Sequence, residues 1–466
     1  MRWIRPWGAL ALALAVIGSA AGKGPLAVHP ENPRYLTDGT GRTVYLTGSH
    51  TWLNVQDAGE RFDFEEYLDF LESHNHNFTR LWAWESAVWV MPDSRLLRLA
   101  PLPYARTGPG SAFDGRPKFD LTRFEPLYFE RLWERVAAAQ ERGIYVSVML
   151  FQGFSVARKS RRRLATPWIA HPFRGPNNIN GIHGDTDGDE EGYEVHTLAN
   201  PEVLRLQEAY VRKVIDTLNG FDNVIYEISN ESHGASAEWQ YHMIRFIQRY
   251  EASKPKQHLV WMSYPWDGIH GLADDRLLFD SPAEIVSPRG GRVPIYGTDP
   301  PVGDGAKIVI ADTDHLWGIG GSRAWVWKSF LRGLHPIFMD PYKNSPYRPE
   351  PTIDPQWDPV RRAMGDTLRI ARRLDLAAMT PTADPAVCST RYCLRDPGEA
   401  YLVYQPAGGA FQLTLEAGTY RAEWFRAATG RTVIEETKRY EGGSHTFRPP
   451  FEGDAVLLLT AAAERD

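Results

Sequence analysis

The stretch Asn223–Glu231, N-V-I-Y-E-I-S-N-E, decides how the rest of the chain is interpreted. It begins as a short apolar strand, because β-branched residues such as Val224 and Ile225 favour an extended backbone. The apolar run then stops at an amide and a carboxylate, Asn230 and Glu231. A buried strand that ends in such a pair is typical of a barrel of eight β/α units, which builds its active site at the carboxyl ends of its strands. The alternative is a solvated strand end at which Asn-Glu merely opens a loop.

Seven other short apolar segments complete this pattern, and most of them alternate with segments of helical periodicity. In chain order, the eight predicted strands are Thr43–Gly48, Asn77–Trp82, Ile144–Phe151, the opening stretch, His258–Ser263, Ala283–Ser287, Lys307–Ala311 and His335–Met339. Two long segments, Ala83–Leu121 and Gln152–Asn200, are predicted to be loops. This alternation indicates an α/β fold, a (β/α)8 TIM barrel. A doubly wound open sheet would alternate similarly, but the chain has no G-x-G-x-x-G turn.

Short alternating strands replace this pattern beyond Ala378. The predicted strands, separated by Gly- and Pro-rich turns, are Arg391–Leu394, Ala400–Tyr404, Ala410–Leu415, Gly418–Phe425, Thr432–Glu436, Ser444–Phe447 and Ala455–Leu459. Such a series is typical of an antiparallel β-sandwich. We therefore predict a barrel over residues 22–378 and a small C-terminal β-sandwich over residues 379–466.

The first 21 residues are predicted to be an export signal. Arg2 and Arg5 precede an uncharged apolar run, Ala9–Ile17, and the small residues that follow offer a cleavage site. Because the run is short for a membrane span, we expect a secreted or periplasmic protein with no membrane span in the mature chain. A retained N-terminal anchor is the alternative. In an oxidising compartment, the closely spaced Cys388 and Cys393 are candidates for a local disulfide.

The composition excludes some classes of partner and favours another. A net charge of −6 and a pI of about 6.2 argue against nucleic acid and against an anionic membrane surface as partners. The chain contains 16 Trp, 20 Tyr and 20 Phe residues. Their flat apolar faces suit stacking on sugar rings, although most of these side chains are expected in the core.

Polar and aromatic residues collect at the carboxyl ends of the predicted barrel strands, where a barrel places its functional groups. They are His50, Trp52, Arg80, Trp82, Gln152, Asn230, Glu231, Ser263, Asp312, Asp314 and Asp340. Carboxylates on strands four and seven suit the cleavage of a glycosidic bond, because one protonates the leaving oxygen while the other attacks or stabilises the anomeric carbon. An arginine beside the second carboxylate lowers the pKa of that acid and keeps it ionised.

This combination resembles that of clan-A glycoside hydrolases, with Arg80 on strand two, Asn230-Glu231 on strand four and a carboxylate at the end of strand seven. Within the clan the chain is most similar to the apiosidase-like barrel group, through Tyr45–Trp52, Asn77–Trp82, Asn177–Gly181 and the opening stretch. Its C-terminal part resembles, over Tyr401–Gln405 and Ala422–Gly430, the small β-domain that often follows such barrels and carries a collagen-binding label. The resemblance covers most of residues 28–463.

The resemblance implies a retaining hydrolase in which Glu231 is the general acid/base. The clan has Glu as the nucleophile on strand seven, whereas this chain offers Asp312 and Asp314. We favour Asp312 as the nucleophile because it directly follows the apolar run, and Asp314 is the second choice. The alternative is an Asp-Thr-Asp turn that only caps a loop. The predicted substrate-binding residues are Arg80, Asn230, His50, Trp52, Trp82 and Asp314.

The sequence thus predicts an exported glycoside hydrolase with a carbohydrate substrate and with neither cofactor nor metal. Asp185, Asp187 and Asp189 have calcium-loop spacing, but Glu190 stands where an EF-type loop needs Gly, so a solvated acidic loop is the alternative. The second hypothesis is a barrel that has lost catalysis and only binds carbohydrate or matrix. A peptidase acting on collagen finds no support, because no nucleophile or metal motif accompanies the β-domain.

Overall fold

The computed structural model describes residues 24–462, except for residues 60–61, 92, 94, 157–165, 266–273, 292–293, 344, 347–351 and 435–436. The predicted export signal, residues 1–21, lies outside the described residues. Within the described part of the chain, no helix combines the length and the apolar character needed to cross a membrane.

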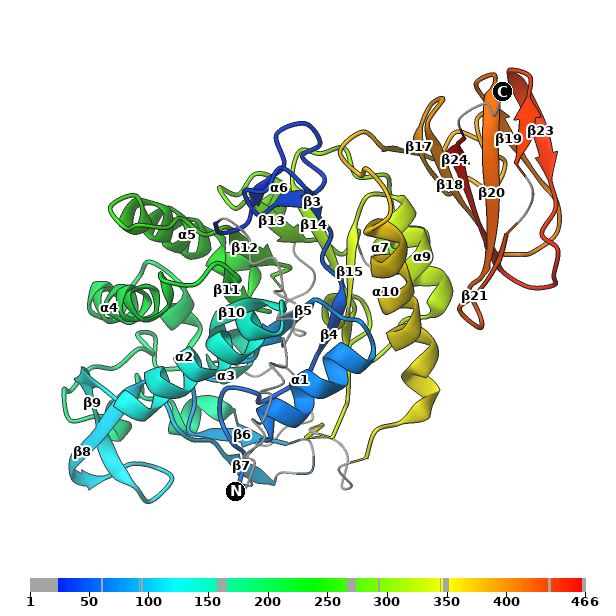
Figure 1. Cartoon of the computed structure of the whole chain (residues 1–466). Helices are drawn as coiled ribbons and strands as arrows, with labels where there is room; N and C mark the ends of the chain where they lie inside the picture. The colour runs from blue at the N-terminus through cyan, green and yellow to red at the C-terminus, as the bar shows by residue number, and fades with distance from the viewer. Residues whose placement is uncertain are drawn as a thin grey trace, which may run out of the picture.

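Eight parallel strands form one sheet that curls into a barrel, which confirms the predicted fold class (Figure 1). In chain order they are β4 (Gly48–His50), β5 (Phe78–Leu81), β10 (Tyr145–Gln152), β11 (Val224–Asn230), β12 (Val260–Ser263), β13 (Ile285–Ser287), β14 (Ile308–Asp312) and β15 (His335–Met339). They pair in the order β4-β15-β14-β13-β12-β11-β10-β5. The strands are apolar because both of their faces are buried: one faces the barrel interior and the other faces the helices.

Helices surround the strands on the outside of the barrel (Figure 1). The longer ones are α1 (Phe64–Ser73), α2 (Pro126–Glu141), α4 (Pro201–Leu218), α5 (Ala237–Glu251), α9 (Arg323–Leu331) and α10 (Asp358–Ala371). In the described parts of the connecting loops, the short α-helices are α3 (Gly153–Val156), α6 (Arg276–Phe279), α7 (Ile295–Thr298) and α8 (Thr313–Leu316).

Side-chain amides join the first two barrel strands, β4 and β5. Asn54 donates to the carbonyl of Arg80 at 2.8 Å and accepts from the N–H of Trp82 at 2.6 Å, as a neighbouring strand would. Gly48 allows the two strands to come this close, because a Cβ on it would lie 2.3 Å from the carbonyl oxygen of Phe78. This junction brings the end of β5, which carries Arg80, against the end of β4.

Two segments differ from the sequence prediction. The predicted first strand, Thr43–Gly48, is divided: β3 (Thr43–Val44) joins β1 (Ala27–Val28) and β2 (Leu36–Thr37) in a small antiparallel sheet, and the barrel strand starts at Gly48. The predicted loop Ala83–Leu121 contains two hairpins, β6 (Val88–Val90) with β7 (Leu96–Arg98) and β8 (Tyr104–Ser111) with β9 (Pro117–Phe124). Gly and Pro within β8 hide its strand pattern, because both residues are unfavourable in strands.

The C-terminal strands form two antiparallel sheets, consistent with the predicted β-sandwich (Figure 1). The larger sheet contains β16 (Thr380–Thr382), β17 (Cys393–Asp396), β18 (Ala400–Gln405), β20 (Gly418–Arg426), β21 (Arg431–Ile434), β22 (Lys438–Tyr440) and β24 (Ala455–Ala461). The smaller one pairs β19 (Phe411–Leu415) with β23 (Gly443–Phe447). Cys388 and Cys393 are both buried and carry free thiols, so the structure does not contain the disulfide that their spacing suggested.

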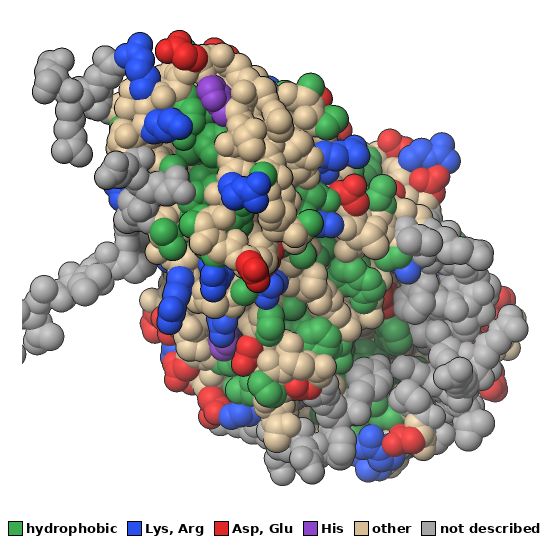
Figure 2. Space-filling model, turned by 90° about the vertical axis from the view of Figure 1, so that its right-hand side faces the viewer, with side chains coloured by type: hydrophobic (Ala, Val, Ile, Leu, Met, Phe, Trp, Pro, Cys, Tyr) green, Lys and Arg blue, Asp and Glu red, His purple; other side chains and the backbone are tan. Residues whose placement is uncertain are grey.

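The β-domain is fixed to the barrel through helix α9. Trp327 stacks on Tyr404 of β18, with ring centres 6.1 Å apart, and Arg323 forms a two-pronged ion pair with Asp454 at 2.8 and 3.0 Å. Leu402 and Tyr404 belong to the same apolar core as the barrel helices. Figure 2 views the molecule from this side, and basic and acidic side chains are interspersed on the face that it shows.

Candidate active site

The barrel interior is layered, and its lower layer is apolar. That layer comes from one cluster that includes Leu46, Phe78, Ile225, Trp261, Ile285, Ile308, Ile310 and Ile337. The completely buried Arg80 of β5 lies against this layer, with its guanidinium carbon 5.1 Å from the ring centre of Trp261. Because desolvation of a charged guanidinium is costly, Arg80 requires anionic partners.

Three carboxylates and one amide share Arg80. Its Nε and Nη2 donate to the two carboxylate oxygens of Glu227 on β11, at 3.0 and 2.5 Å. Its Nη1 donates to Asp312 at 2.8 Å and to Asp314 at 3.0 Å. Nη2 also donates to the amide oxygen of Asn230 at 2.7 Å. One buried guanidinium is thus shared by three carboxyl groups and one amide.

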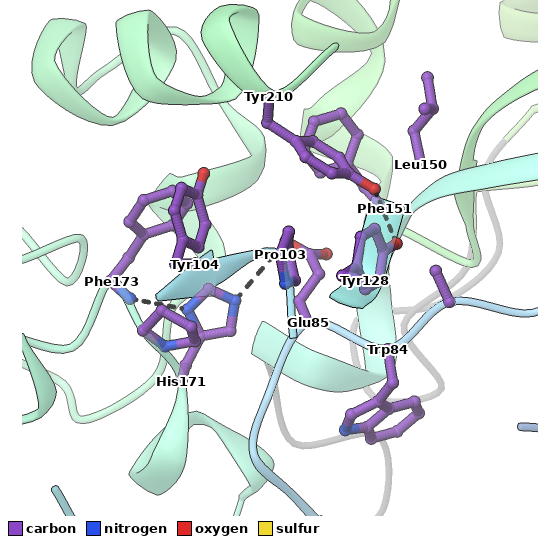
Figure 3. A pocket seen from close by; sticks show the side chains of 12 residues that line it. Trp84, Glu85, Pro103, Tyr104, Tyr128, Leu150, Phe151, His171, Phe173 and Tyr210 are labelled. Atoms are coloured by element: carbon purple, nitrogen blue, oxygen red, sulfur yellow. Dashed lines mark hydrogen bonds and ion pairs between the residues drawn. The ribbon is translucent and has the colours of Figure 1, made fainter. Parts of the chain in front are cut away.

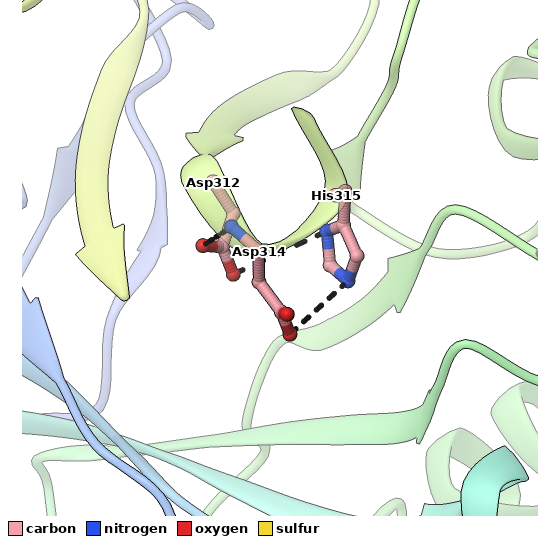
Figure 4. Close-up of side chains that lie close together, drawn as sticks. All are labelled: Asp312, Asp314 and His315. Carbon is pink, nitrogen blue, oxygen red and sulfur yellow. Dashed lines mark hydrogen bonds and ion pairs between the residues drawn. The ribbon is translucent and has the colours of Figure 1, made fainter. Parts of the chain in front are cut away.

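Asp312, the last residue of β14, is enclosed by hydrogen-bond donors. Its Oδ1 accepts from His50 Nε2 and from the backbone N–H of Asp314, both at 2.9 Å, so that Asp312 caps helix α8 (Figure 4). Burial raises the pKa of Asp312, but the contacts with His50 and Arg80 outweigh burial and hold this pKa well below its usual range. Asp312 is 1% exposed and is not among the described residues that line the cleft above it. It is therefore an ionised anchor beneath the site.

Asp314, two residues further along, is among the residues that line the cleft. Figure 4 shows its side chain beside those of Asp312 and His315. Its side chain is 7% exposed. Burial raises the pKa of Asp314 to about 6; Arg80 opposes this shift and the negative charge of Asp312 adds to it. Asp314 is therefore mostly ionised at pH 7, and of the two Asp residues it is the one that lines the cleft.

Trp82 determines which nitrogen of His50 carries the proton. The indole N–H of Trp82 can only donate, and it lies 3.2 Å from His50 Nδ1. Nδ1 must therefore accept, so Nε2 carries the proton that His50 donates to Asp312. His50 is completely buried, whereas Trp82 and its edge-on neighbour Trp52, with ring centres 6.3 Å apart, both line the cleft.

Both the oxygen and the nitrogen of the Asn230 amide have hydrogen-bond partners beneath the cleft. Its oxygen accepts from Arg80 and from His315 Nε2 at 3.1 Å, and its nitrogen donates to Gln152 at 3.3 Å. Burial lowers the pKa of His315 to about 3, so the ring is neutral, and its Nε2 proton points to Asn230. Asn230 thus orients Arg80 and His315. Its predicted contact with a sugar hydroxyl stays a prediction.

A cleft of about 570 Å³ opens above this polar layer. Its lining residues are Trp52, Trp82, Trp89, Phe154, Glu231, Tyr264, Arg289, Asp314, His315, Leu316, Trp317, Gly318, Ile319 and Met339. The carboxyl groups in this lining are Glu231, directly after β11, and Asp314, two residues after β14 and within α8. Aromatic walls can stack on an apolar ring face, while two carboxyl groups in one cleft can give and take protons or attack an electrophilic carbon.

The backbone of Glu231 is strained. Its φ is 48°, in the left-handed region that non-glycine residues rarely adopt. The backbone of Gly153, at the end of β10, lies against it: a Cβ on Gly153 would be 2.2 Å from the carbonyl oxygen of Glu231. Strain of this kind persists only where the surroundings hold it, and it is frequent at functional sites.

The structure thus divides the predicted site residues into two groups. Glu231, Trp52, Trp82 and Asp314 line the cleft, while Arg80, Asn230, His50 and Asp312 form the network beneath it. Asp340 lies elsewhere and pairs with Arg361 at 2.6 and 2.7 Å. The sequence did not predict Glu227, Trp89, Tyr264, Arg289 or Trp317 as site residues. Of these, Glu227 could have been found, because a charged residue inside an apolar strand requires a buried partner of opposite charge, and Arg80 is one.

Among the residues that the structure describes, two acidic clusters each have their potential ligand atoms within 4.8 Å of one another, as a bound cation would require. In the first, Asp312, Asp314 and His315, the guanidinium of Arg80 already supplies a positive charge to both carboxylates. In the second, Asp185, Asp187 and Glu194, the carboxylate of Asp185 accepts from backbone N–H groups of its own loop, at 2.6 and 3.1 Å. These hydrogen bonds close the loop and account for the spacing of the acidic residues in it.

Comparison with known proteins relates the chain to one family and to several solved structures. The model of a family described as a domain of unknown function, DUF6298, matches residues 98–278. No curated protein matches the chain. A solved structure described as a glycoside hydrolase is 14% identical, covers 95% of this chain and 98% of its own, and has a TM-score of 0.56.

Two proteins of Bacteroides vulgatus ATCC 8482 are similar to the same extent. A glycoside hydrolase of family 5 is 15% identical, with coverage of 95% and 94% and a TM-score of 0.57. A second protein, provisionally assigned as a glycoside hydrolase, is 14% identical, with coverage of 96% and 84% and a TM-score of 0.63. At such identities the likeness concerns the fold, and nearly the whole chain therefore has the fold of these glycoside hydrolases.

Proposed function

We propose that the protein is an exported glycoside hydrolase that cleaves O-glycosidic bonds in an oligosaccharide or polysaccharide. One observation carries the proposal: Glu231 and Asp314, which follow the fourth and seventh barrel strands, line the same aromatic cleft. Two carboxyl groups that flank one binding cleft are the machinery that glycoside hydrolysis requires. The likeness in fold to glycoside hydrolases supports the proposal.

Hydrolysis would proceed in two steps with retention of configuration. Asp314 attacks the anomeric carbon while Glu231 gives its proton to the leaving oxygen, so that the glycosidic bond breaks and a glycosyl ester forms on Asp314. Glu231, now a carboxylate, takes a proton from water as the water attacks the same carbon. The ester breaks, the sugar is released, and both carboxyl groups return to their starting protonation states.

In this assignment the nucleophile is Asp314, the second choice of the sequence analysis, because Asp312 is enclosed by His50, Arg80 and a backbone N–H. Asp312 would hold the Arg80 guanidinium in place, and Arg80 would stabilise the carboxylate form of Asp314. Both are roles that buried ion pairs can fill when their remaining hydrogen bonds are satisfied.

The substrate proposed is a side chain of a plant or microbial polysaccharide, as the apiosidase-like resemblance implies. The indole rings of Trp52, Trp82 and Trp317 in the cleft lining are suited to the apolar faces of sugar rings. Export is proposed from residues 1–21 alone. The reaction needs no cofactor, because protonation, attack and deprotonation are all assigned to side chains.

The experiment is hydrolysis of a panel of aryl glycosides and plant oligosaccharides by the wild type and by Glu231→Gln, Asp314→Asn and Asp312→Asn. Asp185→Asn is the matched control, because it removes a carboxylate from an exposed loop. We expect loss of a general acid to cost about 10²–10⁴-fold in kcat. Asp314→Asn should remove activity, and the control should match the wild type.

Nuclear magnetic resonance of the first-formed sugar then reports its anomeric configuration. Retention supports the two-step route, whereas inversion would assign a water molecule, and not Asp314, as the attacking group. If no member of the panel is cleaved, or if cleavage survives both Glu231→Gln and Asp314→Asn, the proposal is wrong and a carbohydrate-binding function gains support.

A further inference from the structure

A buried hydroxyl group, that of Ser232, holds the turn that carries Glu231 through hydrogen bonds. Ser232, the next residue, is completely buried, and its Oγ lies 2.5 Å from Ser229 Oγ and 3.0 Å from His196 Nδ1. The hydroxyl therefore connects the last part of β11 to the loop that follows β10. Because the φ of Glu231 is 48°, the turn needs an external constraint to keep this conformation.

His196 is in turn hydrogen-bonded to Glu85, in the loop after β5. Its Nε2 lies 3.0 Å from Glu85 Oε1, which also accepts from the backbone N–H of Gln152 at 2.6 Å. A carboxylate can only accept, so Nε2 carries a proton, while Nδ1 lies within hydrogen-bond distance of the Ser232 hydroxyl. The ring of His196 is also stacked on Trp239, with centres 4.5 Å apart and planes 16° apart, which fixes its orientation.

Glu85 also has a charge partner on its second oxygen. That oxygen lies 3.6 Å from His171 Nε2, longer than a hydrogen bond, and both residues line a small cavity of about 20 Å³ (Figure 3). His171 Nδ1 accepts from the N–H of Phe173, so Nε2 is the nitrogen with the proton, and it is directed at Glu85. Burial raises the pKa of Glu85, but His196 and His171 outweigh burial and lower it to about 2. Glu85 is therefore a fixed anion at pH 7.

The order Ser232, His196, Glu85 is that of a hydrolytic triad, but it cannot act as one. Ser232 is completely buried and is not among the described residues that line the cleft, so a substrate cannot reach its hydroxyl. A second explanation is that the three groups only satisfy one another's hydrogen bonds. That explanation does not say why this series of hydrogen bonds ends on Ser232, the residue directly after Glu231.

We propose that Glu85, His196 and Ser232 are a positioning relay that holds the carboxyl group of Glu231 where it can protonate the leaving oxygen. The inference rests on the proposed function, in which Glu231 is the general acid. Loops after the second and third strands are thereby coupled to the acid on the fourth. A misplacement of about 1 Å at a reacting group can cost about 10²-fold in rate.

The relay is tested by leaving-group dependence. The substrates are the phenyl and 2,4-dinitrophenyl glycosides of the sugar that the panel identifies. Phenoxide must be protonated as it leaves, whereas dinitrophenoxide leaves without a proton, so only the first substrate depends on the general acid. We expect His196→Ala and Ser232→Ala to lower kcat/KM for the phenyl glycoside about 10²-fold and to change it much less for the dinitrophenyl glycoside.

The matched control is His242→Ala, which removes another histidine paired with a glutamate, Glu208, at 2.9 Å on the outer helices. It should leave both substrates unaffected. Glu231→Gln is the reference and must itself show the leaving-group dependence; if it does not, the proposed function is wrong. If Glu231→Gln shows it while Ser232→Ala and His196→Ala do not, or lower both substrates equally, the relay is purely structural and the inference is overturned.

Discussion

The most informative single substitution is Gly153→Ala, because it tests how closely the fold confines Glu231. A Cβ at this position would lie 2.2 Å from the carbonyl oxygen of Glu231, 2.6 Å from its carbonyl carbon and 2.7 Å from the Cα of Ser232. Ordinary contacts between such atoms are about 3.5 Å, so the turn must move by about 1 Å. We therefore expect kcat/KM to fall about 10²-fold for substrates that need an acid.

The assay pairs steady-state kinetics with thermal unfolding followed by circular dichroism. Overpacking of this kind typically costs about 1–3 kcal/mol, so the melting temperature should fall while the protein stays folded. Gly220→Ala is the control, because a Cβ there meets no heavy atom within 4 Å. A folded Gly153→Ala variant with wild-type kcat/KM would refute the reasoning, since it would show that this contact does not set the position of Glu231.

Three further predictions concern separate parts of the chain. Because the pKa of Asp314 is raised to about 6, its carboxylate is lost as the pH falls through 6, and kcat/KM should decline below that pH; a profile flat down to pH 4 would contradict this assignment. Asp454→Ala should leave the Arg323 charge unpaired at the junction between barrel and β-domain, and lower the free energy of unfolding by about 1–3 kcal/mol in a urea titration; an unchanged transition would contradict it. Cys388 and Cys393 are buried free thiols, so an alkylating reagent should label neither in the native protein and both after denaturation without reductant; a mass lower by two hydrogens would instead establish a disulfide.

Much of the barrel could be predicted because its strands are buried on both faces. The strand His335–Met339 has the predicted bounds, and the strand that ends at Asn230 was found from its apolar run and polar end. The start of the first barrel strand was predicted wrongly. Thr43–Val44 has the pattern of a strand, but it pairs with β2 in a separate sheet. Sequence pattern reports burial, and it does not report which neighbour a short strand pairs with.

Part of the site was predictable in its members, but the exposure of those residues was not. Arg80 stood out as a charge in an apolar strand, and the structure gives it three carboxylate partners. The choice between Asp312 and Asp314 depends on the direction of the chain after β14. There Asp312 turns inward to cap α8, as the alternative interpretation of the Asp-Thr-Asp turn anticipated, and Asp314 turns to the cleft.

The relay behind Glu231 could not be predicted from the sequence. Glu85, His196 and Ser232 lie in three different loops, and no motif spacing relates them. Their approach depends on the parallel pairing of β10 with both β5 and β11, which brings the ends of these three strands together. Residue spacing within one loop does not supply that information.

The most direct test of the central claim is to trap the glycosyl-enzyme. A 2-deoxy-2-fluoro glycoside of the cleaved sugar, with dinitrophenolate as the leaving group, slows the second step and lets the ester accumulate. Peptide mass spectrometry then locates the added sugar. The account predicts a label on Asp314, which disappears in Asp314→Asn and persists in Asp312→Asn. A label on Asp312, or turnover of the true substrate with no covalent intermediate, would contradict it.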